Sequence, residues 1–418
     1  MIWPFKSKKV AELEAENQRL KNEISITDSQ AFKEMFLGGV SGKTAVNQNT
    51  AMTCSAVFSC VRLIAGAIAS SSVKIYKKNS DGESELVNQH PYKRLLDLSP
   101  NDHITASTFW KTLATHKILN GNAYAPIVRS KSGRPLGLIP ISNKRCAPYQ
   151  AWELGLDKKI SVRSDRLYYE VQWDNGTTSM IDQDDMIHVP NIGWDGKRGL
   201  STLSAGARAI GLGLAGDESA ESLFENGLNS QIALRYDGKM APEAQEELRN
   251  HIKSKYSSAG NHNTPLILTQ GGDVKSISMN ANDAQLIESR QFSVIDICRF
   301  FGVPPIMVGE SEKTSSWGSG VEQMARWFVM FTLNDHFTDI EQELEKKLFR
   351  ASGYYCKFDE TELTRGDTKT RADYYKASIG GTQNPAWMTI NEIRKAENLP
   401  PLDSGDQLFK PQGETNEE

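Results

Sequence analysis

The chain has 418 residues, which predicts about two to four structural units, and its hydrophobic content of 39% is enough to build folded cores. A formal net charge of −4 argues against a strongly basic domain for tight nucleic-acid binding. The five cysteines lack CxxC spacing and are odd in number, which indicates a reducing compartment and excludes a disulfide framework or zinc site. Because neither a signal peptide nor a bilayer-spanning apolar run is found, we expect a soluble intracellular protein.

Residues 9–25 show a heptad pattern. Its a and d positions are Val10, Leu13, Asn17, Leu20 and Ile24. Asparagine at a central a position commonly sets the register of a parallel coiled coil, which suggests self-association. Barely two heptads are marginal alone, so a simple surface helix is the alternative.

The segment GGVSGKT at 38–44 superficially resembles a phosphate-binding loop. The motif requires glycine where this chain has Leu37, and no strand leads into the segment. We therefore expect no nucleotide site there.

Residues 26–200 are predicted to form one α+β domain. A helix over 51–72 precedes an alternating strand at 73–78, and a further helix at 106–120 follows a short one at 90–101. The stretch from 131 to 190 is rich in strands, with a hairpin turn signal at Asp174-Asn175-Gly176.

Four side chains near the end of this domain suggest a metal cluster, namely Asp182, Asp184, Asp185 and His188. However, the alternating pattern places the histidine on a strand and the aspartates in the turn before it. The favoured interpretation is a turn followed by a hydrogen-bonded strand histidine, because no second group of ligands completes a site.

A helix over 201–227 is unusually small on one side and acidic in its second half. The small residues there suit tight packing between neighbouring helices. The acidic side chains recur at helical spacing, and they are Asp217, Glu218, Glu221 and Glu225. Such a face is ordinarily solvated, and a second interpretation is given below.

Residues 229–280 are predicted to form a small α/β module between the helices at 203–226 and 282–301. Its elements are a strand, a helix starting at Pro242, and two more strands.

The stretch 282–348 is predicted to be a helix, a stop, a polar loop and a very long helix. Asn282 is the expected N-cap, Gly302 suits the left-handed position after the helix, and Pro304-Pro305 forbid a helical restart. The second helix runs from Val321 to Leu348, and the loop before it carries one aromatic residue, Trp317.

The C-terminal part is predicted to contain a strand within 351–363 and two helical segments. Thr389 and Glu392 have the form of a capping box, and a polar tail ends the chain.

Several segments in this order and spacing resemble the portal proteins of tailed double-stranded-DNA bacteriophages, Hong Kong 97 type. They include SAVFSCVRLIAGAIASSSVKIYK, HPYKRLLDLSPN, DDMIHVPNIGWDGKRGLSTLSAGARAI, DAQLIESRQFSVIDICRFFGVPPIMVGE and TINEIRKAENLPPLDSGD. Only the first fifty or so residues and the last fifteen are poorly covered.

The resemblance implies an α+β portal fold assembled as a twelve-fold ring. Its parts would be an N-terminal heptad helix (1–25), a wing (26–200), stem helix 1 (201–228), a clip (229–280), stem helix 2 (281–303), a tunnel loop (304–320), a long helix returning to the wing (321–364), a crown (365–405) and a disordered tail (406–418).

The function implied is a channel at one capsid vertex through which double-stranded DNA is packaged and ejected. Implied partners are further copies of the chain, non-specifically passing DNA, the terminase large subunit, a head–tail adaptor, and the major capsid protein or scaffold. The location would be the virion, with the host cytoplasm during assembly. No catalytic residue, cofactor, metal or membrane is implied. The alternatives are a metal-dependent nuclease using Asp182, Asp185 and His188, and a coiled-coil assembly factor.

Two sets of residues are candidates for facing DNA in such a channel. The tunnel-loop set is Glu312, Lys313, Thr314, Ser315, Ser316, Trp317 and Ser319. The stem set is Asp217, Glu218, Glu221 and Glu225, unless these acids pair with arginines of an adjacent subunit.

Overall fold

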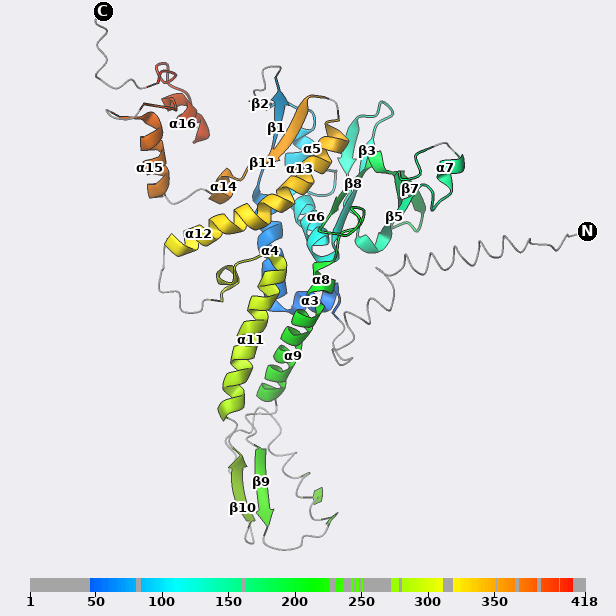
Figure 1. Ribbon diagram of the computed structural model, residues 1–418, viewed down its shortest axis with the longest axis vertical. Coiled ribbons are helices and arrows are strands. Elements are labelled where there is room, and N and C mark those ends of the chain that lie inside the picture. Colours follow the sequence, from blue (N-terminus) through cyan, green and yellow to red (C-terminus); the bar gives the residue numbers. More distant parts are fainter. Residues whose placement is uncertain are drawn as a thin grey trace, which may run out of the picture. The chain divides into compact units, whose positions relative to one another are not determined.

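A computed structural model describes the chain in two compact units, one formed by Met1–Ser315 with Phe331–Phe358 and the other by Ser316–Met330 with Asp359–Glu418 (Figure 1). The described residues are 46–79, 84–159, 162–225, 231–236, 242–243, 246–247, 250, 272–277, 280–310, 319–350, 352–364, 368–381, 385–397 and 399–408. The heptad, the phosphate-loop-like segment and loop residues 311–318 lie outside them, as does most of the helix predicted from Pro242.

The first unit begins with two helices where the sequence predicts one. Helix α3 (Gln48–Thr53) begins with a capping box at Asn47. Helix α4 (Ser55–Ser70) starts after Cys54, whose extended backbone separates the two helices. Apolar residues of α4 recur every three or four positions, so one face is buried. That face packs against α6 (Ala106–Asn120), which ends at Gly121 with φ of 80°.

The strands of the first unit form small antiparallel sheets. The first sheet has the order β11 (Tyr354–Phe358), β1 (Val73–Lys78), β2 (Ser84–Leu86). The second has the order β4 (Pro135–Leu138), β3 (Asn122–Arg129), β8 (Met186–Pro190). The third has the order β5 (Cys146–Gln150), β6 (Leu167–Gln172), β7 (Thr178–Asp182). Short helices α5 (Lys93–Asp97) and α7 (Leu156–Lys159) connect them. The predicted hairpin turn joins β6 to β7, with Gly176 at φ of 78°.

Residues late in the chain complete the core that the early residues begin. Helix α13 (Asn334–Leu348) packs on β8 and β11. Its Phe337 stacks on Phe358 of β11, with ring centroids 4.8 Å apart, and Trp110 of α6 meets the edge of the same ring. The domain predicted over 26–200 is therefore completed by residues 331–358, because β1 requires β11 as its partner.

A pair of long helices with a small two-stranded sheet between them follows β8 in the chain. The predicted helix at 201–227 is present as α8 (Thr202–Ala205) and α9 (Ala207–Glu225), interrupted at Gly206. Strands β9 (Gln231–Tyr236) and β10 (Gly272–Ile277) pair with each other, and α11 (Asn280–Phe301) comes next. The predicted N-cap at Asn282 is wrong, since α11 starts at Asn280. Both asparagines suit a helix start, so residue type alone does not choose between them.

The end of α11 is partly as predicted. Gly302 has φ of 67°, which confirms the left-handed position. The prediction that Pro304-Pro305 forbids any restart is wrong, because a 3-10 turn spans Pro305–Val308. Proline is tolerated at the first position of a helical turn, where no N–H is needed.

The second unit is helical. It contains α12 (Ser319–Phe328), α14 (Thr361–Thr364), α15 (Thr368–Ile379) and α16 (Ile390–Ala396). The predicted long helix is confirmed as α12 and α13 joined by a π-helical segment, Val329–Leu333, and the capping box of Thr389 with Glu392 is also confirmed. Among the described helices, none is both long and apolar enough to span a bilayer.

Candidate functional site: the α9–α11 helix pair

Helices α9 and α11 lie side by side, and α11 also packs on α4 (Figure 1). Glycines on α9 allow the close approach. A Cβ on Gly213 would lie 3.4 Å from Cδ1 of Ile297, and one on Gly216 would lie 3.5 Å from Cγ of Arg290. The predicted close neighbour of this small face is therefore α11 of the same chain, which accounts for the glycines without a second subunit.

The predicted acidic face divides into two environments. The carboxylate of Asp217 accepts a hydrogen bond from Arg290 at 2.7 Å, and both side chains are about half exposed. Glu218 and Glu221 are exposed. Glu221 lies one turn along the same face as Asp217, whereas Glu218 is rotated about 100° from it. Glu225 is the last residue of α9, and its side chain is outside the described set.

A cavity of about 240 Å³ lies between α9, α11 and the start of α4. Cys54, Gly213 and Ile297 supply its apolar lining, and the Asp217–Arg290 pair and Glu310 supply its charge. Glu310 belongs to the candidate tunnel loop and is the last described residue before the gap at 311–318. The described first part of the loop therefore ends beside the helix pair. The candidate residues Glu312 to Trp317 lie outside the described part, and Ser319 begins α12.

The described first part of that loop contacts the rest of its unit on two sides. Its 3-10 turn packs against α4 and α11. At the end of α11, the hydroxyl of Thr332 donates a hydrogen bond of 2.5 Å to the carbonyl of Gly302. A Cβ on Gly302 would lie 3.0 Å from the same hydroxyl oxygen, so glycine is needed both for its φ and for this contact.

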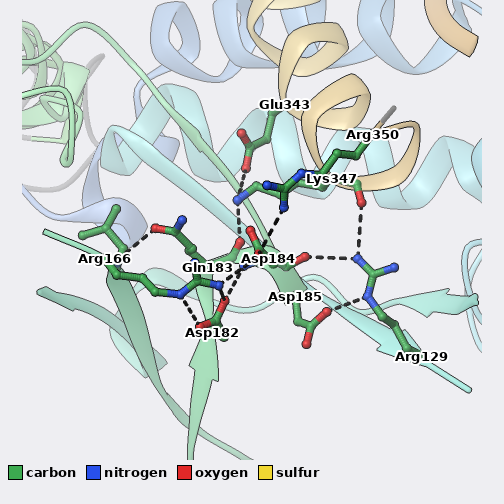
Figure 2. A network of polar contacts seen from close by, with 10 residues as sticks. Arg129, Arg166, Asp182, Gln183, Asp184, Asp185, Glu343, Lys347 and Arg350 are labelled. Atoms are coloured by element: carbon green, nitrogen blue, oxygen red, sulfur yellow. Dashed lines mark hydrogen bonds and ion pairs between the residues drawn. The ribbon is translucent and has the colours of Figure 1, made fainter. Parts of the chain in front are cut away.

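The three aspartates proposed as metal ligands face arginines instead (Figure 2). Arg166 donates to Asp182 at 2.6 Å and to Asp184 at 2.7 Å, and Arg129 donates to Asp185 at 2.5 Å. Each carboxylate thus already has a cationic partner.

His188 is buried in β8 with both ring nitrogens engaged. Nδ1 lies 3.0 Å from the hydroxyl of Tyr169, and Nε2 lies 3.0 Å from Oδ1 of Asn122. Burial lowers the pKa of His188 to about 3. The turn and strand-histidine interpretation is confirmed, and no group of three or more potential ligands is found among the described residues.

Two buried polar groups escaped the sequence analysis because their partners are remote in the chain. Lys347 lies 3.5 Å from Glu343 and donates to the carbonyl of Gln183, which ties α13 to the turn before β8 (Figure 2). Lys117 of α6 lies 2.8 Å from His336 and 2.6 Å from Asp339. A lysine inside an amphipathic helix gives no sign of such a contact.

Comparisons with known proteins agree with this architecture. A family model described as "Phage portal protein" matches residues 55–398. The portal protein of Enterobacteria phage HK97 is 28% identical over 376 residues, covering 89% of this chain and 85% of that relative. The probable portal protein of Streptomyces phage phiC31 is 28% identical over 377 residues, covering 88% and 80%.

Solved structures share the fold. A chain in the neck of an empty GTA particle computed with C6 symmetry has a TM-score of 0.58 at 21% identity, covering 88% of this chain and 99% of that chain. An HK97 family phage portal protein from Corynebacterium diphtheriae has a TM-score of 0.54 at 18% identity, covering 77% and 98%. Because the family match spans most of the sequence, this chain belongs to the phage portal protein family.

Proposed function

We propose that this protein is the subunit of a ring at one capsid vertex, and that double-stranded DNA is packaged and ejected through the central channel of the ring. The observation that carries the proposal is the family match over residues 55–398. Ring assembly is supported by two GTA neck structures that contain chains with this fold, one computed with C6 symmetry and the other with C12 symmetry. We take twelve as the number of subunits in the particle.

The parts of the ring follow the segments of the chain. The wing consists of residues 26–200 and the return at 321–364, and the stem consists of α9 and α11. The clip is residues 229–280, the tunnel loop is residues 304–320, and the crown is residues 365–405. Strands β9 and β10 pair only with each other among the described strands. Their outer edges suit docking of a terminase large subunit and later a head–tail adaptor. The wing would meet the major capsid protein or scaffold.

The charge of the proposed channel suits a sliding duplex. Each phosphate neutralised by lysine or arginine adds salt-dependent affinity, so a strongly cationic wall would trap DNA. The tunnel-loop candidates carry one acid, Glu312, and one base, Lys313. Exposed Glu218 and Glu221 on α9 add repulsion. This role requires no catalytic group on the chain, and we assign none.

Negative-stain electron microscopy of the purified full-length protein tests ring formation. We expect rings with a central hole. Material that stays monomeric over all concentrations and salt conditions would contradict the proposal. A variant lacking residues 1–25 should still form rings; if it falls to monomers, the N-terminal heptad drives assembly and the coiled-coil alternative is favoured.

A further inference from the structure

Two cysteine side chains meet where the stem joins the rest of its unit. The Sγ atoms of Cys60 on α4 and Cys298 on α11 lie 3.9 Å apart, although the residues are separated by 238 positions in the chain. Both residues are fully buried, with 0% of their surface exposed, and both are free thiols.

The surrounding packing holds the two thiols together. Cys60 is flanked on its helix by Val57, Val61 and Ile64, all buried. Cys298 lies between Ile297 and Phe301 on the buried side of α11. Because α4 and α11 pack directly against each other, the two sulfurs meet within that helix contact.

We propose that Cys60 and Cys298 form an oxidation site at which a peroxide produces a disulfide joining α4 to α11. A disulfide needs a sulfur–sulfur distance of about 2.05 Å. The remaining approach of roughly 2 Å is within the reach of side-chain rotation about Cα–Cβ. The cavity of about 240 Å³ is lined by Ile297, the residue before Cys298, so peroxide has to pass from that cavity into the helix contact to reach the thiols.

The chemistry is a two-electron oxidation. The hydrogen bond from Cys60 lowers the pKa of the Cys298 thiol, so Cys298 is the thiol that ionises first. Its thiolate attacks one peroxide oxygen, the O–O bond breaks, and water leaves with the proton of the medium to give a sulfenic acid. The sulfur of Cys60 then attacks the sulfenic sulfur, the S–O bond breaks, and a second water leaves. Two thiols and one hydrogen peroxide thus give one disulfide and two waters.

The consequence is a covalent lock on the stem. The reduced protein has no covalent link between α4 and α11, whereas the disulfide closes a loop from residue 60 to residue 298 that contains α6, α9 and strands β1 to β10. Oxidation therefore fixes the stem on the wing and restricts the unfolded chain. The inference does not depend on ring formation, because both residues belong to one chain.

To test this, reduced full-length protein is treated with hydrogen peroxide and its remaining free thiols are alkylated under denaturing conditions. Its peptides are then mapped without reduction. We expect the Cys60 peptide linked to the Cys298 peptide, at least tenfold above the level in Cys60→Ser or Cys298→Ser, and released by dithiothreitol. Cys146→Ser, which removes a buried thiol in β5, is the matched control and should leave the link intact.

A second measurement needs no variant. The urea midpoint of the oxidised wild-type protein should rise above that of the reduced protein, and dithiothreitol should restore it. The proposal is overturned if peroxide leaves both thiols alkylatable, if it yields only sulfinic acid at either position, or if Cys60 links to Cys54 instead.

Discussion

Arg290 of α11 donates a hydrogen bond of 2.7 Å to Asp217 of α9, and the aliphatic part of the Arg290 side chain lies beside Gly216, the residue before Asp217. One side chain thus fixes both the charge and the spacing of the helix pair. Asp217 is paired within its own chain, so among the described side chains of α9 the exposed acids are Glu218 and Glu221. This division sharpens the electrostatic part of the proposed function.

The Asp217–Arg290 pair should contribute little to stability. Both side chains are about half exposed, with 45% and 47% of their surface accessible, so water and salt screen the interaction. In a double-mutant cycle with Asp217→Asn and Arg290→Gln, we expect a coupling of about 0.2–1 kcal/mol that shrinks as salt is added. Urea unfolding measures it. A coupling above about 2 kcal/mol would mean that the pair is buried in the assembled protein.

Charge reversal at the stem should make the ring retain DNA. If Glu218 and Glu221 line the channel, the double variant Glu218→Lys, Glu221→Lys should bind duplex DNA with a steeper salt dependence than the wild-type ring. Filter binding at several salt concentrations measures this. The matched control reverses two exposed acids elsewhere, Asp97→Lys with Asp102→Lys. Equal DNA retention by both double variants would place the α9 acids away from the channel.

A substitution at Gly121 should be far more harmful than one at Gly133, although both have φ near 80°. A Cβ on Gly121 would lie 2.4 Å from the carbonyl oxygen of Gly199, whereas a Cβ on Gly133 meets nothing within 4 Å. Gly133→Ala should therefore cost only backbone strain, about 1 kcal/mol, and Gly121→Ala at least about 3 kcal/mol. Chemical denaturation measures both. Similar losses at the two sites would show that the loop around Gly199 gives way.

Two buried histidines should make stability depend on pH. Burial lowers the pKa of His188 and of His336 to about 3, and Lys117 beside His336 acts in the same direction. Between about pH 6.5 and pH 3 the unfolded chain binds protons at these sites and the folded chain does not, so the free energy of unfolding falls as the pH falls. The expected slope is about 1.4 kcal/mol per pH unit for each histidine.

Urea unfolding between pH 7 and pH 4.5 measures that slope. His188→Gln should reduce the slope by up to about 1.4 kcal/mol per pH unit. His103→Gln, which changes an exposed residue, should leave the slope unchanged. A slope that is the same in all three proteins would show that His188 is not responsible.

Removing only one member of the buried Glu343–Lys347 ion pair of α13 should lower the stability of the protein. Burial raises the pKa of Glu343 and lowers that of Lys347, which means that for both groups desolvation outweighs their mutual attraction. Lys347→Met leaves a buried carboxylate without its cation and should destabilise the protein by about 3–5 kcal/mol. Adding Glu343→Gln should recover part of that loss. Thermal unfolding checks this, and a double variant less stable than Lys347→Met would contradict it.

Local patterns in the sequence were sufficient for most helices and strands. The helix ending at Gly121, the hairpin turn at Gly176 and the capping box at Thr389 all depend on residues a few positions apart, and all three are confirmed. The start of α11 and the 3-10 turn at Pro305 were missed because several neighbouring residues suit each role.

Contacts between distant residues could not be predicted. Asp217 and Arg290 are 73 positions apart, and Lys117 and His336 are 219 apart, so no spacing rule connects them. The helix pair that carries the candidate site was predicted, together with its small face. The partner of that face was not, since a stripe of glycine and alanine fits a neighbouring subunit as well as a helix of the same chain. The tunnel-loop residues stay a prediction.

The pairing of β1 with β11 also governs how the chain can be made. At ~5–20 residues per second, the ribosome needs roughly a quarter of a minute to a minute for the roughly 280 residues between these strands. Throughout that time the edge of β1 that pairs with β11 in the folded protein is unpaired, so it can pair with a strand of another nascent chain. Truncated versions that stop before Tyr354 should therefore aggregate during expression, because the first unit can complete its sheet only after β11 has been synthesised.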